Sequence, residues 1–407
     1  MSKRKQPAKR TDTRAGFSTI SVHGGQDRRK PESAITTPIF QTSTFIFASL
    51  AEQVRYAQQR SQGKATRFEY GRYGSPTQRD AERKVAELEG AESALSFASG
   101  MAAVTTAMLT FASSGQHIVC GDEVYKKTRD FCVSVLPRFN VETTFVTSTD
   151  LQAIKKALRP TTAMVFLECP TNPRLFVPDL AKTARLVHEN SRAVFVVDST
   201  FATPVNLRPL ALGSDLVLHS VTKYLGGHND ILGGVVAGPR RLIDAIFELE
   251  KSLGGIMDAH CAYLLIRGLK TLDVRMRKHN ENGVAVARFL TQHPKVRTVY
   301  YPGLRQHPSY RLARKQMAGF GGVVSFEVEG DPEAAGRFLD ALTIPYLGPS
   351  LGGVESLAYH PASLTFNEMS PAEREALGIT DQLVRLSCGI EDAKDLIADL
   401  SQALDKV

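Results

Sequence analysis

The chain has few cysteines and no long apolar run, and each absence excludes a class of protein. Its 407 residues include five cysteines, which are scattered and form no Cys-x-x-Cys pair. An odd, scattered set argues against a disulfide framework and against a zinc site, so we expect no bound metal. No apolar run approaches the ~18 residues that a transmembrane helix needs. We therefore expect a soluble protein of the reducing cytoplasm, with no membrane partner.

The positive charge of the chain is concentrated in a short tail. The formal net charge is +8, and six basic residues lie in the first fourteen positions: Lys3, Arg4, Lys5, Lys9, Arg10 and Arg14. The rest of the chain is nearly balanced, so we expect residues 1–16 to be a disordered, solvated tail. A basic nucleic-acid-binding protein is the alternative from another functional class. Salt-dependent nucleic-acid binding that survives removal of residues 1–16 would support it.

Short apolar runs alternate with amphipathic stretches between Glu92 and Ala237. The runs are residues 94–97, 117–120, 141–146, 163–168, 193–198 and 215–219. Several are continuous Val, Leu and Phe runs, which is typical of strands buried on both faces. Helical segments between them predict βαβ units, and therefore an α/β fold with a mostly parallel central sheet. Ligands of such sheets bind at the carboxyl ends of the strands, so the residues ending each run are site candidates.

The pattern changes near Ile256. Long helical patterns follow at residues 259–281 and 283–292, and strands are expected at 321–327 and 383–387. We predict four parts: the tail (1–16), an N-terminal arm (17–65), a larger α/β domain (66–258) and a smaller C-terminal α/β domain (259–407).

Lys223 directly follows the predicted strand 215–219, which places it at the site end of the sheet. Hydroxyls at Ser220 and Thr222 flank it and are suited to binding phosphate, and glycines follow at 226 and 227. A lysine held in a partly desolvated pocket has a lowered pKa and serves as an amine nucleophile for carbonyl chemistry. A surface lysine in a Gly-rich loop is the alternative.

Two other strand ends complete a possible cofactor site. Asp198 ends the run 193–198, and it is either a helix N-cap or an anionic partner for a cofactor. Pyridoxal 5'-phosphate (PLP) needs such a carboxylate to keep its pyridine nitrogen protonated. Ser99, Gly100 and Met101 follow the run 94–97 and open a helical stretch, where free N–H groups and the helix dipole favour a phosphate. Together with Lys223, these residues predict a PLP site.

Five motifs occur in the order seen in the Cys/Met-metabolism (trans-sulfuration) PLP-dependent enzymes, and the chain resembles that family from about residue 17 to 407. The motifs are residues 70–77 (YGRYGSPT), 99–101 (SGM), 168–173 (ECPTNP), 198–204 (DSTFATP) and 220–228 (SVTKYLGGH). The resemblance implies the PLP-dependent transferase fold type I, with residues 66–258 as the PLP-binding domain. It also implies homotetramers built from dimers whose active sites are shared.

The same resemblance implies roles for individual residues. Lys223 would carry the cofactor, Asp198 would pair with the pyridine nitrogen, and Tyr125 would stack on the ring and assist proton transfer. The other cofactor-binding residues would be Ser99, Gly100, Met101, Asn172, Ser220 and Thr222, with Tyr70 and Arg72 from the neighbouring subunit. The substrate α-carboxylate would be held by Asn172, Ser350 and Arg385, since a guanidinium forks onto both of its oxygens.

Within the family, the segment from Tyr125 to Arg129 (YKKTR) and the proline at 349 resemble plant-type cystathionine γ-synthases. Lys126 or Lys127, and Lys127 in particular, would supply positive charge to a phosphate leaving group; otherwise both face solvent. We therefore expect a γ-replacement that joins an activated homoserine ester to cysteine and forms cystathionine. A cystathionine or methionine γ-lyase and an O-acylhomoserine sulfhydrylase are the alternatives, and the activating group on homoserine stays open.

Overall fold

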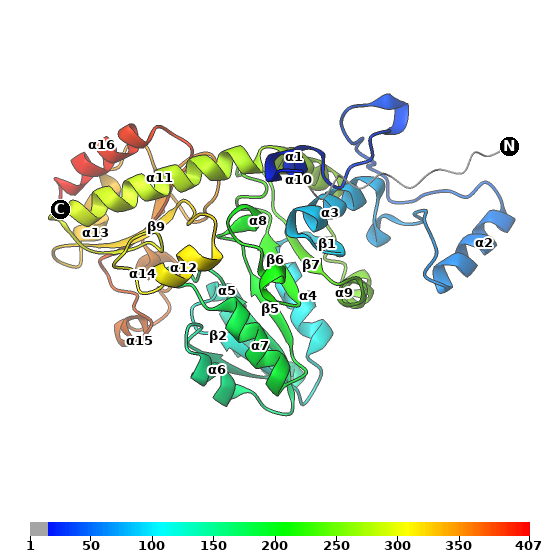
Figure 1. Ribbon diagram of the computed structural model, residues 1–407, viewed down its shortest axis with the longest axis horizontal. Coiled ribbons are helices and arrows are strands. Elements are labelled where there is room, and N and C mark those ends of the chain that lie inside the picture. Colours follow the sequence, from blue (N-terminus) through cyan, green and yellow to red (C-terminus); the bar gives the residue numbers. More distant parts are fainter. Residues whose placement is uncertain (1–14) are drawn as a thin grey trace.

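The computed structural model describes residues 15–407, which form two β-sheets with helices packed around them (Figure 1). The predicted disordered tail lies outside the described residues, apart from residues 15 and 16. Among residues 15–407, no helix combines the length and the apolar character needed to cross a membrane.

The larger sheet has seven strands in the order β1-β7-β6-β5-β4-β2-β3. Its strands are β1 (Ser93–Phe97), β2 (His117–Gly121), β3 (Glu142–Val146), β4 (Thr162–Glu168), β5 (Val194–Asp198), β6 (Leu216–Ser220) and β7 (Gly234–Gly238). Strands β2 to β6 pair in parallel, whereas β7 runs antiparallel to both β1 and β6. The expected mostly parallel central sheet is confirmed: the six predicted runs correspond to β1–β6 with bounds within two residues, whereas the antiparallel strand β7 was not predicted.

Both faces of this sheet are buried, as the continuous apolar runs indicated. Val196 and Leu218 pack on one face under α4 (Gly100–Phe111) and α9 (Arg240–Leu253). Val197 and Val217 pack on the other face, under α7 (Leu180–Asn190) and α3 (Pro76–Glu89) respectively. The helices of this part are α3 (Pro76–Glu89), α4 (Gly100–Phe111), α5 (Lys126–Asp130), α6 (Leu151–Ala157), α7 (Leu180–Asn190), α8 (Thr203–Asn206), α9 (Arg240–Leu253) and α10 (Ala259–Lys270). Short turns of other helix types occur at η2 (Gly71–Tyr73), η3 (Phe131–Val135), η4 (Leu136–Phe139) and η5 (Pro209–Leu212).

The smaller sheet has five strands in the order β10-β11-β12-β9-β8. They are β8 (Val296–Tyr300), β9 (Val323–Val328), β10 (Tyr346–Leu347), β11 (Leu357–Tyr359) and β12 (Leu383–Ser387). The helices of this C-terminal part are α11 (Leu272–Gln292), α12 (Tyr310–Gln316), α13 (Ala334–Asp340), α14 (Pro361–Leu364), α15 (Pro371–Ala376) and α16 (Ala393–Leu404), of which α12 packs in the apolar cluster of the larger sheet. The boundary predicted between residues 258 and 259 falls directly before α10 and stays a prediction.

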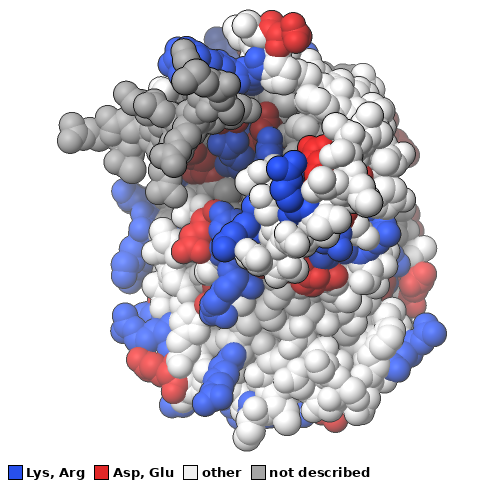
Figure 2. All heavy atoms as spheres, turned by 90° about the vertical axis from the view of Figure 1, so that its right-hand side faces the viewer, with Lys and Arg blue, Asp and Glu red and all other residues white. Residues whose placement is uncertain are grey.

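The N-terminal arm is held by α1 and by hydrogen bonds from residues 37–45, whereas its second helix lies apart. Helix α1 (Phe17–His23) packs against α3, α10 and α11, while α2 (Leu50–Ser61) extends away from the sheets (Figure 1). The arm also contains η1 (Pro31–Ser33), and Thr44 forms an isolated β-bridge with Tyr70. Apolar side chains of the arm face outward: Ile35 is 88% exposed and Ile46 is 85% exposed. On the face seen in Figure 2, basic and acidic side chains are interspersed.

Candidate active site

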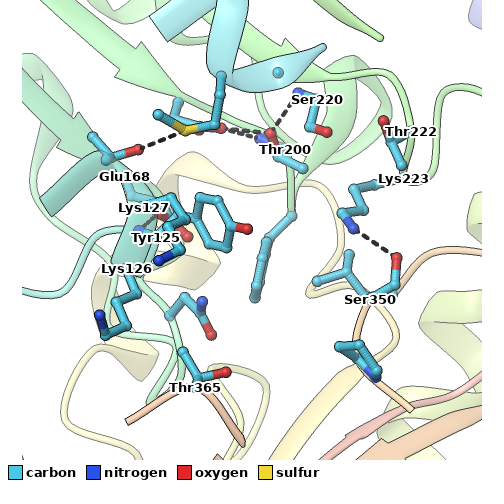
Figure 3. A pocket seen from close by; sticks show the side chains of 18 of the residues that line it. Tyr125, Lys126, Lys127, Glu168, Thr200, Ser220, Thr222, Lys223, Ser350 and Thr365 are labelled. Atoms are coloured by element: carbon cyan, nitrogen blue, oxygen red, sulfur yellow. Dashed lines mark hydrogen bonds between the residues drawn. The ribbon is translucent and has the colours of Figure 1, made fainter. Parts of the chain in front are cut away.

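A cavity of about 510 Å³ lies at the carboxyl ends of the parallel strands (Figure 3). The predicted residues that line it are Ser99, Gly100, Met101, Tyr125, Lys126, Lys127, Asn172, Asp198, Ser220, Thr222, Lys223, Ser350 and Arg385. The cavity therefore joins residues of both sheets and their loops, because Ser350 lies in the loop before β11 and Arg385 lies on β12 of the smaller sheet.

Lys223 projects into this cavity from the turn after β6. Its Nζ donates a hydrogen bond to Oγ of Ser350, 2.6 Å away. Burial, together with the nearby charge of Arg385, lowers the pKa of Lys223 from 10.5 to about 8. A substantial fraction of the amine is therefore neutral just above neutral pH, which is what a nucleophile or a general base requires.

Arg385 is a buried cation at the centre of β12. Its guanidinium donates to Oδ1 of Asn172 at 3.0 Å and to the carbonyl oxygen of Ser350 at 2.8 Å, and it lies over the ring of Tyr359. Its Nε is buried without a partner, and it forms no ion pair within residues 15–407. Such a charge is costly unless an anion is supplied. A substrate carboxylate fits this requirement.

Asp198 ends β5 and is buried at the wall of the cavity. One of its carboxylate oxygens accepts hydrogen bonds from the backbone N–H of Thr200, at 2.9 Å, and from the hydroxyl of Thr200, at 2.6 Å. Burial raises the pKa of Asp198, and the two bonds from Thr200 oppose that rise. A protonated pyridine nitrogen of a cofactor beside Asp198 would favour the ionised form of the Asp198 carboxyl group.

Glu168 is a second buried carboxylate, and we did not single it out from the sequence. It ends β4 and pairs in register with Asp198, and its Oε2 accepts the backbone N–H of Tyr125 at 2.8 Å. Burial, followed by the charge of Asp198, raises the pKa of Glu168 well above its usual range. The rule that strand ends carry the site could have found Glu168, because it ends the predicted run 163–168.

The start of α4 fits a phosphate group. Among residues 15–407, the backbone N–H groups of Gly100 and Met101 have no acceptor, because the Ser99 hydroxyl caps the N–H of Ala102 instead. A Cβ on Gly100 would lie 2.9 Å from Cβ of Ser220, so the turn after β6 closes directly on this helix end. Free N–H groups beside hydroxyls are the usual surroundings of a bound phosphate.

Lys126 and Lys127 lie at the mouth of the cavity, where they are ion-paired. Nζ of Lys126 is 2.9 Å from Oδ1 of Asp130 and 3.5 Å from Oε2 of Glu368, and Nζ of Lys127 is 2.9 Å from Oδ2 of Asp130. The side chain of Lys126 is 11% exposed and that of Lys127 is 60% exposed. Both lysines border the cavity, but only Lys127 is largely exposed to solvent, and the predicted contact with a phosphate leaving group stays a prediction.

Tyr70 and Arg72 lie outside this cavity. Arg72 donates a hydrogen bond to the carbonyl oxygen of Lys251 and stacks on the ring of Tyr73, and both predicted residues border a separate shallow hollow under the arm. Neither residue lines the cavity of its own chain. Their position is compatible with the predicted contribution to a neighbouring subunit.

A family model described as Cys/Met metabolism PLP-dependent enzyme matches residues 18–405. The chain belongs to this family. The expected family and cofactor are therefore confirmed, whereas the roles of individual residues stay predictions.

Named relatives of the chain include both synthases and lyases. It is 45% identical over 392 residues to cystathionine gamma-synthase 1, chloroplastic, from Nicotiana tabacum, an alignment that covers 96% of this chain and 72% of the relative. It is 41% identical to an L-methionine gamma-lyase from Fusobacterium nucleatum subsp. polymorphum, covering 96% of this chain and 98% of the relative. The specific activity therefore does not follow from family membership.

A solved structure confirms the expected fold type. The crystal structure of metB from Corynebacterium glutamicum superimposes with a TM-score of 0.90 at 39% sequence identity, covering 96% of this chain and 98% of that one. The chain is thus an α/β protein of PLP-dependent transferase fold type I, and an enzyme of the trans-sulfuration type.

Proposed function

We propose that this protein is a cystathionine γ-synthase, which replaces the activated hydroxyl of a homoserine ester with the sulfur of cysteine. The observation that carries this choice is the pair of lysines, Lys126 and Lys127, that follow Tyr125 at the mouth of the cavity. A cation there can stabilise negative charge on a departing phosphate. The similarity to the tobacco synthase supports the same choice.

The proposed substrate position follows from Arg385. Its guanidinium, with the amide of Asn172, holds the α-carboxylate of the homoserine ester and orients the substrate. The γ-carbon then lies toward the mouth, where Tyr125, Lys126 and Lys127 stand. Ser350 accepts the hydrogen bond of the Lys223 amine and keeps it beside the reacting carbons.

Lys223 and Asp198 move and hold protons in the proposed reaction. When bound, PLP supplies an aldehyde and an electron-withdrawing ring that stabilises negative charge next to the substrate amine. Nζ of Lys223 removes the proton from Cα, a task that its lowered pKa suits. Once that proton has been passed to the carbon of bound PLP that is joined to the substrate nitrogen, Nζ is neutral again and removes a proton from Cβ. Asp198, held by Thr200, keeps a proton on the ring nitrogen. Tyr125, positioned by Glu168, assists the later proton transfer.

Lys127 is the proposed contact of the leaving group. Its side chain is largely exposed, and Asp130 is its one ion-pair partner among residues 15–407, so it can turn toward a phosphate at a low cost in free energy. Lys126 is less free, because it is nearly buried and contacts two carboxylates. O-Phosphohomoserine is therefore the activated substrate that we propose.

Product analysis tests this function most directly. The PLP-loaded enzyme is incubated with O-phospho-, O-succinyl- or O-acetylhomoserine, each with cysteine or sulfide, and the products are separated. We expect cystathionine from O-phosphohomoserine and cysteine, and no product from Lys223→Ala. A 2-oxo acid and ammonia as the main products would identify a γ-lyase, the alternative that the similarity to the Fusobacterium enzyme favours. Homocysteine formed from sulfide would identify a sulfhydrylase.

We also propose a cytoplasmic homotetramer built from dimers, in which Tyr70 and Arg72 complete the site of the neighbouring subunit. Two features support it: both residues lie outside the cavity of their own chain, and the arm exposes large apolar side chains such as Ile35 and Ile46. Exposed apolar surface of this kind marks an interface. Sedimentation velocity of the loaded enzyme measures the assembly, and a monomer would contradict it.

A further inference from the structure

Four charged side chains meet at the mouth of the cavity, and their formal charges cancel. Lys126 and Lys127 are cations, and Asp130 and Glu368 are anions, with each anion within 3.5 Å of a lysine nitrogen. Lys126, Lys127 and Glu368 line the cavity itself. A mouth made only to attract an anionic leaving group would not need two carboxylates.

Binding of an anionic leaving group does not account for Glu368. Its carboxylate would repel a phosphate, and Lys126 does not need it, because Asp130 already lies 2.9 Å and 3.0 Å from Nζ of Lys126. Glu368 is 75% exposed, and within residues 15–407 its carboxylate has the 3.5 Å contact with Lys126 as its one polar contact. Its carboxylate is therefore available to a cation that enters the mouth.

The second substrate brings such a cation. The leaving group and the incoming thiol both bond to Cγ, so they occupy the same end of the cavity one after the other. The ammonium and carboxylate of an α-amino acid are joined through a single carbon. They therefore match a carboxylate and a lysine nitrogen that lie 3.5 Å apart.

We propose that Lys126 and Glu368 form the subsite for a zwitterionic amino-acid thiol, with its carboxylate on Nζ of Lys126 and its ammonium on the carboxylate of Glu368. This inference rests on the proposed function, and it assigns recognition of the nucleophile to two named side chains. The ion pair between Lys126 and Glu368 opens as the amino acid enters, and each residue exchanges one partner for another. Hydrosulfide, which has neither group, gains nothing from this subsite.

A panel of thiols tests the two contacts separately in the PLP-loaded enzyme. Cysteine carries both charges, cysteamine only the ammonium, and 3-mercaptopropionate only the carboxylate. With one homoserine ester fixed, Glu368→Gln should lower the kcat/KM ratio of cysteine to 3-mercaptopropionate about tenfold. Lys126→Met should lower the ratio of cysteine to cysteamine by a similar factor. Glu375→Gln, an exposed acid that does not line the cavity, is the matched control and should keep both ratios.

The same subsite is testable if the enzyme breaks the bond between Cγ and sulfur instead of forming it. The cysteine half of cystathionine would then occupy it, so Glu368→Gln should lower the kcat/KM ratio of L-cystathionine to L-methionine about tenfold in elimination. A wild-type enzyme that eliminates and forms no thioether would contradict the proposed function while this ratio still decides the subsite. If Glu368→Gln leaves these kcat/KM ratios unchanged, in synthesis or in elimination, the proposed subsite is wrong.

Discussion

Replacing Lys223 with methionine should stabilise the cofactor-free protein at neutral pH, although it removes a hydrogen bond. Burial, with the nearby charge of Arg385, lowers the pKa of Lys223 from 10.5 to about 8. Below pH 8 the folded protein therefore contains a buried charged amine, which lowers its free energy of unfolding. A difference of about 2.5 pKa units corresponds to about 3 kcal/mol. The lost bond from Nζ to Ser350 offsets about 1 kcal/mol of this gain. The expected net stabilisation at pH 7 is about 2 kcal/mol.

The sign of the stability difference between Lys223→Met and the wild type should change with pH. Between pH 8 and 10.5 the unfolded chain keeps a proton on Lys223 that the folded chain has released, so the stability of the wild type rises with pH across that window. Above pH 10.5 the cost is gone, and only the lost hydrogen bond remains. Lys223→Met should then be less stable than the wild type by about 1 kcal/mol.

Urea unfolding of the cofactor-free proteins, followed by circular dichroism at pH 7, 8, 9 and 10.5, measures both quantities. The difference between wild type and variant cancels the titration of the other groups. Lys182→Met, at a lysine whose side chain is 65% exposed, is the control and should show no change of sign. A stability difference for Lys223→Met that does not vary with pH would refute the argument from burial.

Three further predictions concern the leaving group, the assembly and the phosphate position. Lys127→Ala should lower kcat/KM for O-phosphohomoserine by about 10- to 100-fold, or about 1.4 to 2.8 kcal/mol, and affect O-acetylhomoserine little; equal losses would assign this lysine to the fold. Arg72→Ala and Arg385→Ala should each be inactive and regain activity when their subunits are mixed, whereas no recovery in proven mixed dimers would place Arg72 in its own chain's site. Gly100→Ala should weaken PLP binding at least tenfold in an absorbance titration, because the new Cβ would lie 2.9 Å from Cβ of Ser220; unchanged affinity would move the phosphate elsewhere.

Much of the candidate site could be predicted from the sequence because its residues stand next to strongly patterned strands. A continuous apolar run indicates a strand buried on both faces, and the residues that end parallel strands meet at one edge of the sheet. Lys223, Asp198 and the segment from Ser99 to Met101 follow such runs directly, and the structure gathers them around one cavity. For these residues, local pattern and chain order were sufficient.

The tertiary structure decided everything that depends on which side chain meets which. Periodicity records that a residue is buried, but not its partner, so no pattern indicated that Ser350 would accept the bond from Lys223, 127 positions away. Likewise, only the fold shows that Asp130 holds both lysines and that Glu368 arrives beside Lys126 from a loop 242 positions away. The charged groups at the mouth of the cavity come from segments that are distant in the chain. The sequence alone does not say how close those segments lie in space, so it could not predict the balance of charge there.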